Sequence, residues 1–274
     1  MSSAARRVLV VVPTYNERES LPGALKRLAA YVPQADVLVV DDGSPDGTAD
    51  LAQTLAEQDE PGRGRLAIHV LRRTAKQGLG PAYLAAFAWA LDHGYDVVVE
   101  MDADGSHRAQ DLPALLARAD DAELVIGSRW VPGGSVVNWP LKREVLSRGA
   151  NLYVRLMLGL PIKDATAGFR AYRADLLRRM PLGDVASQGY GFQVDMTLRA
   201  RTAGARIAEV PITFVEREYG TSKMSGGIIG EALVSVAKWG IAQRTEQVTG
   251  ALNRVFRRTG GRLSGAGSSD IRKP

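Results

Sequence analysis

The segment Asp96-Val-Val-Val-Glu-Met-Asp-Ala-Asp-Gly-Ser-His107 joins a short apolar run to a pair of carboxylates. Residues 97–99 predict a buried strand, and Asp102 and Asp104 follow it with only Ala103 between them. In an extended segment, residues two apart project to the same side, so both carboxylates can face one point. Two negative charges held that close are costly unless a proton or a cation lies between them.

A divalent metal is one occupant of such a point, and a solvated Asp-x-Asp turn without a ligand is the alternative. Mg²⁺ and Mn²⁺ suit carboxylate oxygens, and such ions usually keep positions open for water and substrate phosphates. The carboxyl end of a strand is also where open α/β sheets bind ligands. We therefore predict a metal–diphosphate site on Asp102 and Asp104, with Ser106 as a third ligand whose role the sequence leaves open.

The composition limits the chemistry. The chain has 274 residues, 45% of them hydrophobic, which allows a sizeable core. It has no cysteine, so disulfides, zinc–thiolate sites and cysteine nucleophiles are excluded. The net charge of +5 favours anionic partners such as nucleotides, lipid phosphates or an anionic membrane. We expect no nucleic-acid partner, because no such motif is present, and no apolar run is long enough for a membrane span.

Apolar runs alternate with amphipathic stretches through the first half of the chain. This alternation predicts an α/β fold with a mostly parallel central sheet and helices on both faces. The expected strands cover residues 7–12, 36–40, 65–71, 97–102 and 123–127. Polar, glycine-bearing loops follow these strands, so they gather at the sheet edge where nucleotides bind. Neither a Gly-x-Gly-x-x-Gly turn nor a P-loop is present, which disfavours dehydrogenases and P-loop enzymes.

The second half is less regular. The pattern predicts a loop, a basic helix, a loop entering a strand, a helix and an edge strand interrupted by Pro211, at residues 131–140, 142–158, 164–172, 189–200 and 207–214. We expect a catalytic domain over residues 1–225, an amphipathic helix over 226–250 and a basic, disordered tail over 251–274. In the amphipathic helix, Trp239 lies among basic residues such as Lys238 and Arg244.

Taken together, the loops resemble a known family. The motifs are Pro13-Thr-Tyr-Asn-Glu17, Val40-Asp-Asp-Gly-Ser-Pro-Asp-Gly-Thr48, Lys76-Gln-Gly-Leu-Gly80, Met101-Asp-Ala-Asp104, Gly127-Ser-Arg129, Thr166-Ala-Gly-Phe-Arg170, Gly191-Phe-Gln193 and Tyr219-Gly-Thr-Ser-Lys223. In this order they resemble family 2 glycosyltransferases of the GT-A (Rossmann-like) fold, and among them the polyprenol (dolichol) phosphate mannosyltransferases. Arg129, Gly191-Phe-Gln193 and Ser222-Lys223 indicate the lipid-phosphate branch.

The resemblance implies GDP-mannose as the donor and Mg²⁺ or Mn²⁺ as the cofactor. The residues implied to bind the nucleotide sugar are Pro13, Tyr15, Glu17, Asp42, Lys76, Asp102, Ala103, Asp104 and Gln193. Among these, Asp42 is expected to accept hydrogen bonds from the base and Lys76 to contact the diphosphate, unless Lys76 belongs to an ordinary loop. Gln193 has a helix-packing role as its alternative. Some relatives carry Gln at the position of Ser106.

The implied acceptor is a polyprenyl or dolichyl monophosphate. The cations expected to hold its phosphate are Arg129, Arg148, Arg217 and Lys223. A phosphate monoester has its second pKa at about 6, so it arrives already nucleophilic and no catalytic base is expected, His107 included. We expect in-line attack with inversion, with Asp104, Arg129 and Lys223 as the catalytic residues.

Two alternatives stay open beside this hypothesis. One is a UDP-glucose-dependent polyprenyl-phosphate glucosyltransferase, and the other is a catalytically silent sugar-nucleotide-binding regulatory module. The lipid acceptor implies a peripheral location at the cytoplasmic face of the cell membrane. Helix 226–250 then lies in the membrane interface or packs on the domain's own core. An integral membrane partner protein is also expected.

Overall fold

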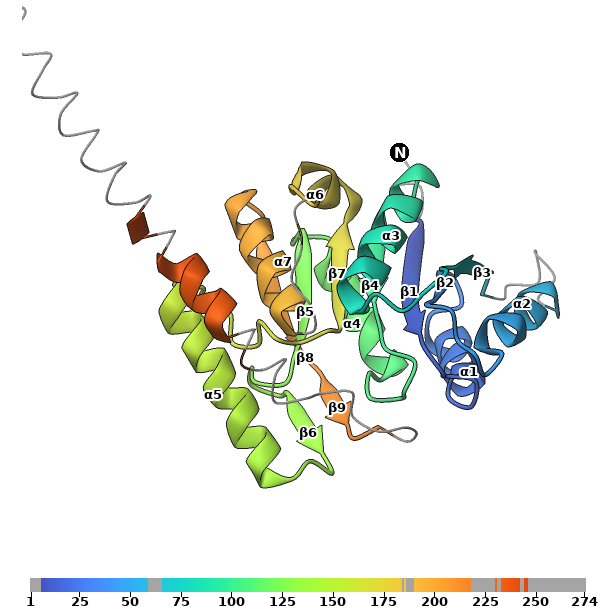
Figure 1. Ribbon diagram of the computed structural model, residues 1–274, viewed down its shortest axis with the longest axis horizontal. Helices are drawn as coiled ribbons and strands as arrows, with labels where there is room; N and C mark the ends of the chain where they lie inside the picture. The colour runs from blue at the N-terminus through green and yellow to red at the C-terminus, as the bar shows by residue number, and fades with distance from the viewer. Residues whose placement is uncertain are drawn as a thin grey trace, which may run out of the picture.

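The computed structural model describes residues 6–58, 66–183, 185, 190–217, 230, 233–241 and 244–245. A seven-stranded sheet forms its centre, in the order β3-β2-β1-β4-β7-β5-β8, and a small sheet pairs β6 with β9 (Figure 1). The strands are β1 (Val8–Thr14), β2 (Asp36–Asp41), β3 (Ile68–Arg72), β4 (Val97–Glu100), β5 (Leu124–Ser128), β6 (Ser135–Val137), β7 (Arg170–Arg173), β8 (Ile207–Pro211) and β9 (Thr213–Val215).

Helices cover both faces of the large sheet. They are α1 (Leu21–Tyr31), α2 (Thr48–Gln58), α3 (Leu79–Asp92), α4 (Leu112–Arg118), α5 (Leu141–Leu158), α6 (Ala174–Arg179) and α7 (Tyr190–Thr202), with a 3₁₀ turn η1 (Ala109–Asp111) before α4. Strand β1 shows how the sheet divides the core: Leu9 and Val11 pack on the side of α3 and α7, and Val10 packs on the side of α1 and α4. The continuous apolar strands arise because both faces are buried.

The predicted parallel sheet is confirmed, with one antiparallel strand inside it. Strands β3, β2, β1 and β4 run parallel to one another, and β5 runs parallel to β8. Strand β7 lies between β4 and β5 and is antiparallel to both. The sheet is therefore continuous only through the four residues of β7.

Three local expectations need correction. Strand β4 ends at Glu100, so Asp102 and Asp104 lie in the following loop and not in the extended strand. The predicted loop over residues 131–140 contains β6. The predicted single edge strand over residues 207–214 is two strands in different sheets, because Pro211 closes β8 and the chain then pairs as β9 with β6. Proline has no N–H for a further ladder bond.

The predicted C-terminal helix is described only over residues 230, 233–241 and 244–245, and the tail over 251–274 lies outside the described residues. In the described part, Val236 is 2% exposed and belongs to the core, and Trp239 packs against that core. Leu233, Val234 and Ile241 remain exposed. The part of the helix that is described thus packs on the domain and still presents apolar side chains outward. No helix in the described ranges has the length and hydropathy needed to cross a membrane.

Candidate active site

The ends of β1 and β2 bring several of the predicted nucleotide-sugar residues together. Pro13, near the end of β1, lies in register with Val40 of β2. Tyr15 follows directly, and the Lys76 Nζ lies 4.1 Å from the centre of its ring. Glu17 accepts a 2.8 Å hydrogen bond from the Ser20 hydroxyl at the start of α1. Tyr15 and Lys76, which are far apart in sequence, therefore lie side by side at the predicted donor edge.

Asp42 already has a cationic partner. Its Oδ1 accepts a 2.6 Å hydrogen bond from Arg73, a residue that the motifs did not single out. The neighbouring Asp41 accepts hydrogen bonds from the Ser44 N–H and the Thr14 hydroxyl, so it stabilises the turn after β2. Asp42 is only 6% exposed, and its Oδ1 is already bonded to Arg73. The hydrogen bond from the nucleotide base to Asp42 stays a prediction.

The metal-candidate loop follows β4 and is held by its own backbone. Gly105 has φ +81°, a conformation that other residues adopt only with strain, and it turns the chain after Asp104. The Ser106 N–H donates to the Asp104 Oδ1 at 3.0 Å. The Asp102 N–H donates to the His107 Nδ1 at 3.0 Å. His107 is 2% exposed and stacks on Phe169, so it supports the loop as a buried acceptor.

The donors of this loop fit a divalent cation. Burial raises the pKa of Asp102 above its ordinary value and the charge of Asp104 adds to the rise, while His107 and Arg217 oppose it. The Asp102 side chain keeps 37% exposure, so solvent screens part of this effect. The buried Ser106 hydroxyl has no hydrogen-bond partner among the residues that the structure describes. Because the described residues contain no cluster of three metal-binding side chains, a cation here relies on water and phosphate for its other ligands.

Gln193 lies at the base of the site. It is 2% exposed, and its Nε2 donates to the Glu100 Oε2 at 2.8 Å. Burial raises the pKa of Glu100 to about 8, although Arg170 and Gln193 both act to lower it. Arg170 is fully buried and donates to the main-chain oxygens of Ala165, Ala167 and Gln193. Gln193 is thus built into the core beside β4, and its contact with the donor stays a prediction.

Arg129 forms an ion pair inside the protein, whereas the sequence predicted that it binds a phosphate of the acceptor. Its Nε and Nη2 donate to both oxygens of Asp164, at 2.8 and 2.6 Å. Arg129 is 4% exposed and Asp164 is fully buried. Asn151 of α5 and Thr166 complete the network through the same carboxylate. This bidentate pair occupies the Nε and Nη2 edge of the guanidinium, which is then closed to a phosphate.

Two tryptophans and two arginines form what we call the Arg–Trp cluster: Trp130, Trp139, Arg143 and Arg148. Arg143 lies 4.0 Å from the centre of the Trp139 ring, and Arg148 lies 4.0 Å from that of Trp130. The indole N–H groups of both tryptophans are buried, and no group in the described part of the chain accepts a hydrogen bond from them. The side chain of Arg148 is 55% exposed. The cluster therefore offers accessible cationic charge beside two unsatisfied donors, a combination suited to an anion.

Arg217 connects the Arg–Trp cluster to the metal-candidate loop. Its Nη1 lies 3.6 Å from the Asp104 Oδ2. The adjacent Glu216 pairs with Arg143 of the cluster. Phe214 makes edge contacts with both Trp139 and His107, at 5.3 and 5.4 Å between ring centres. The fourth predicted cation, Lys223, lies outside the described residues.

The sequence reasoning missed several residues of this site. They are Arg73, Glu100, Trp130, Trp139, Arg143 and Asp164. Trp130 directly follows the motif that ends at Arg129, and Glu100 precedes the Asp-x-Asp pair by two residues. Their places beside these motifs could have marked both as site residues. Asp164 lies far from Arg129 in sequence, and no local pattern joins them.

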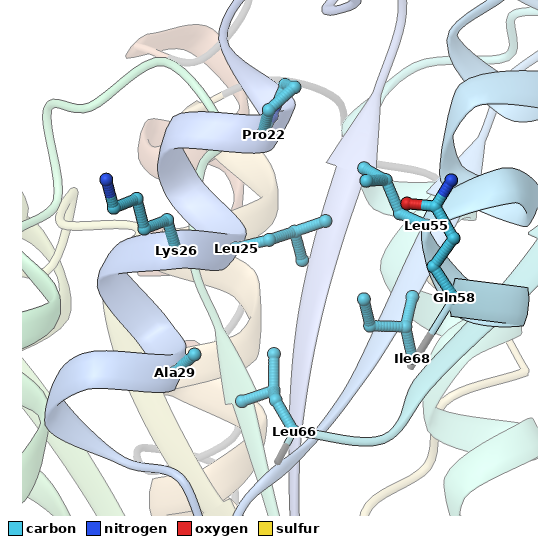
Figure 2. Close-up of a pocket in the computed structure, with 8 residues that line it drawn as sticks. All are labelled: Pro22, Leu25, Lys26, Ala29, Leu55, Gln58, Leu66 and Ile68. Carbon is cyan, nitrogen blue, oxygen red and sulfur yellow. The ribbon is translucent and has the colours of Figure 1, made fainter. Parts of the chain in front are cut away.

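A groove between α1, α2 and β3 lies apart from these groups (Figure 2). Its volume is about 370 Å³, and Leu25, Leu55 and Ile68 converge on it. Among the described residues, no predicted site residue lines it, and Lys26 is the charged side chain that does. The groove thus offers no chemistry to the site at the strand ends.

Comparison with known proteins shows the family to which this chain belongs. The model of the family described as Glycosyl transferase family 2 matches residues 9–180. The chain is 60% identical over 240 residues to an undecaprenyl-phosphate mannosyltransferase of Micrococcus luteus, covering 88% of this chain and 96% of the relative. It is 54% identical over 248 residues to a polyprenol monophosphomannose synthase of Mycolicibacterium smegmatis, covering 90% and 92%.

Solved structures support the fold independently. Glucosyl-3-phosphoglycerate synthase from Mycobacterium tuberculosis, in complex with Mn²⁺, UDP-glucose and phosphoglyceric acid, has a TM-score of 0.59 and 21% identity. The match covers 86% of this chain and 81% of that one. A likeness at this identity shows the GT-A fold, and the family rests on the closer sequences. The chain belongs to glycosyl transferase family 2, in the branch of the polyprenyl-phosphate mannosyltransferases.

Proposed function

We propose that this chain transfers mannose from GDP-mannose to a polyprenyl monophosphate with inversion, giving polyprenyl-phosphate-mannose. The Micrococcus luteus and Mycolicibacterium smegmatis relatives described above are named for mannose transfer to such lipids. The observation that carries the proposal is the 3.6 Å approach of Arg217 to Asp104. This contact joins the predicted donor loop to the cationic Arg–Trp cluster, so that donor and acceptor phosphates meet at one place.

We propose Asp102 and Asp104 as the ligands of Mg²⁺ or Mn²⁺, with the buried Ser106 hydroxyl, which no described residue hydrogen-bonds, as a third candidate. The glucosyl-3-phosphoglycerate synthase that shares the fold was solved with Mn²⁺ and UDP-glucose. A divalent cation bound here supplies positive charge to the diphosphate of the leaving nucleotide. Lys76 adds a second cation at the donor edge, where Tyr15 holds its ammonium group.

The acceptor phosphate is bound, in this proposal, by Arg143, Arg148 and Arg217. Arg148 is the most exposed of them, and the adjacent indole N–H groups of Trp130 and Trp139 have no acceptor within the described ranges. We assign Arg129 a positioning role instead, because Asp164 occupies its fork. Lys223 retains its proposed role as an acceptor cation from sequence alone.

No side chain is needed to remove a proton. A phosphate monoester is largely dianionic above pH 6, so its oxygen attacks the sugar C1 without a base. The bond to the nucleotide phosphate breaks on the opposite side, and the anomeric centre inverts. The protein then contributes alignment of the two phosphates and stabilisation of the charge on the leaving group. His107, buried and bonded to the Asp102 N–H, fits this scheme as a support for the loop.

We place the enzyme at the cytoplasmic face of the cell membrane, because the acceptor lipid lies in a bilayer and nucleotide sugars are drawn from the cytoplasm. It is proposed to be peripheral there. An integral membrane partner protein is a further proposed interaction, which pull-down from detergent-solubilised membranes with the tagged chain would test.

The test is transfer of radiolabel into organic solvent from GDP-mannose, with UDP-glucose in parallel, onto a short polyprenyl phosphate. Reactions contain Mg²⁺, Mn²⁺ or a chelator. We expect label from GDP-mannose alone and loss of transfer with the chelator. Label from UDP-glucose alone would overturn the donor and leave the fold and mechanism standing. Activity that persists with the chelator would contradict the metal site. Tight GDP-mannose binding without turnover, acceptor present, would indicate a silent binding module.

A further inference from the structure

The turn that follows β1 is held by side chains from the segment between β2 and α2. Three successive N–H groups of this turn donate to such side chains, those of Asn16, Glu17 and Arg18. Their acceptors are, in the same order, the Ser44 Oγ at 3.0 Å, the Thr48 Oγ1 at 3.1 Å and the Asp46 Oδ2 at 3.2 Å. We call Ser44, Asp46 and Thr48 the turn clamp.

Two of the acceptors are hydroxyl groups that carboxylates fix in turn. The Ser44 hydroxyl donates to the Asp41 Oδ2 at 2.5 Å, and the Thr48 hydroxyl donates to the Asp46 Oδ1 at 2.5 Å. Each hydroxyl therefore donates to a carboxylate while it accepts from a backbone amide. Hydrogen bonds in such chains polarise one another, and a charged acceptor strengthens them. Thr48 is fully buried and Asp41 is 1% exposed, so little water competes for these bonds.

Helix capping accounts for only part of this arrangement. The Thr48 N–H donates to the Asp46 Oδ1 at 3.0 Å, which is the ordinary role of an aspartate before a helix such as α2. The bonds from Arg18 and Glu17 come from a different segment of the chain, and a cap for α2 does not need them. Burial acts to raise the pKa of Asp46, but hydrogen bonds from Thr48 and Arg18 outweigh it and lower that pKa below its ordinary value. The carboxylate therefore stays charged and accepts through both oxygens.

The clamped turn has an uncommon backbone conformation. Asn16 has φ 58°, in the left-handed region that few residues other than glycine adopt. Such conformations persist where the surroundings determine them, and they cluster at ligand-binding sites. Just before the turn, the Thr14 hydroxyl donates to the Asp41 Oδ2 at 3.0 Å. Tyr15 is therefore held from both sides, because Asp41 binds Thr14 directly and reaches Asn16 through Ser44.

The residues that the turn clamp fixes are those expected to bind the donor. The Tyr15 ring lies 4.1 Å from the Lys76 Nζ, and Glu17 is another predicted nucleotide-sugar residue. We infer that the three residues of the turn clamp are positioning residues, which hold Tyr15 and Glu17 in the donor-binding conformation before the nucleotide sugar arrives. The clamp thereby reduces the entropy lost on binding, since the turn is already ordered. The identity of this ligand rests on the proposed function.

Hydrogen exchange tests the clamp without any ligand. Thr48→Val removes the hydroxyl at nearly constant shape, and Thr48→Ser keeps it. Thr54→Val is the matched control, because the Thr54 hydroxyl donates to the Asp50 carbonyl within the same helix. We expect the amides of residues 16–18 to exchange about tenfold faster in Thr48→Val and at the wild-type rate in the other two variants. Wild-type exchange of these amides in Thr48→Val would overturn the inference.

Calorimetry with GDP and Mn²⁺ tests whether the clamp serves the donor. The Kd for GDP should rise about tenfold in Thr48→Val and stay within about twofold of the wild type in Thr48→Ser and Thr54→Val. Ser44→Ala breaks the other hydroxyl chain and should also raise the Kd, which keeps the test independent of whether Thr48→Val folds. The KM for a short prenyl phosphate should not follow the Kd for GDP. Faster exchange with an unchanged Kd would show a purely structural clamp and overturn the inference.

Titration with UDP in parallel separates this inference from the proposed function. If the wild type binds UDP and not GDP, the proposed donor fails, and Thr48→Val should then weaken UDP binding by the same factor. Nucleotide binding without mannose transfer would overturn the proposed function alone, because the clamp acts on binding. A wild type that binds neither nucleotide would overturn both.

Discussion

The donor edge and the acceptor side of this molecule hold their charged groups in different ways. At the donor edge, strand ends and tight turns present short side chains, and backbone N–H groups fix them, as the Ser106 N–H fixes Asp104. On the acceptor side, long side chains are held by one another: Arg129 by Asp164, Arg148 by Trp130 and Glu144. Short motifs can specify the first arrangement. The second depends on residues brought together by the fold.

The largest expected effect comes from a substitution at the donor edge. Replacing Asp104 by Ala should lower kcat by about 10²–10³-fold or more, because it removes both a proposed metal ligand and the partner of Arg217. Steady-state transfer of labelled mannose measures this, and the circular dichroism spectrum should stay that of the wild type. Asp50→Asn is the matched control, because Asp50 forms an ion pair with Arg72 while its side chain is 77% exposed. Wild-type turnover in Asp104→Ala would remove Asp104 from the catalytic residues.

The second effect concerns the stability of the acceptor side. Asp164→Ala leaves the Arg129 guanidinium buried without its carboxylate, and breaking a buried pair in this way costs about 3–5 kcal/mol. The midpoint of urea unfolding should fall accordingly. Glu144→Ala is the control, because it breaks the exposed pair with Arg148, which is worth about 0.5 kcal/mol or less. Equal shifts for the two variants would show that burial does not distinguish the pairs.

A third experiment sharpens the division between donor and acceptor groups. Arg148→Ala removes an exposed cation from the Arg–Trp cluster and should raise the KM for the lipid phosphate by about tenfold. The KM for GDP-mannose should stay unchanged, because the residue lies on the acceptor side. Arg155→Ala, an exposed arginine about two turns farther along the same helix, is the comparison. A rise in the donor KM alone would reverse the assignment.

The smallest effect lies at the far edge of the sheet, on β3. Burial lowers the pKa of His69 below its ordinary 6.5, with Asp36 opposing and His93 and Arg7 adding to the shift. Below pH 6.5 the unfolded chain therefore binds this proton more readily than the folded one, so stability falls as the pH drops below that value. His69→Gln should flatten the pH dependence of the unfolding midpoint between pH 7 and 5. A steeper dependence in the variant would contradict the sign.

The contrast explains what the sequence could predict. The parallel strands, their apolar cores and the loops after them follow from local patterns, and Tyr15 and Lys76 lie in loops that those patterns predicted. Asp102 and Asp104 instead lie in the loop beyond the strand that was expected to carry them. The antiparallel β7 was not predictable, because strand order depends on long-range pairing. The pairing of Arg129 with Asp164 was missed for the same reason, since arginine alone does not reveal whether a carboxylate or a ligand fills its fork.

The position of β7 also affects how the chain is made. During synthesis, β4 is complete at residue 100, but the strand that pairs with its second edge does not emerge until residue 170. Over that interval the nascent sheet exposes the unpaired backbone of Val97–Glu100. This edge is short, and its side chains are apolar except that of Glu100. Such edges recruit other strands. That edge of the sheet therefore stays open to other strands until the four-residue β7 pairs with it.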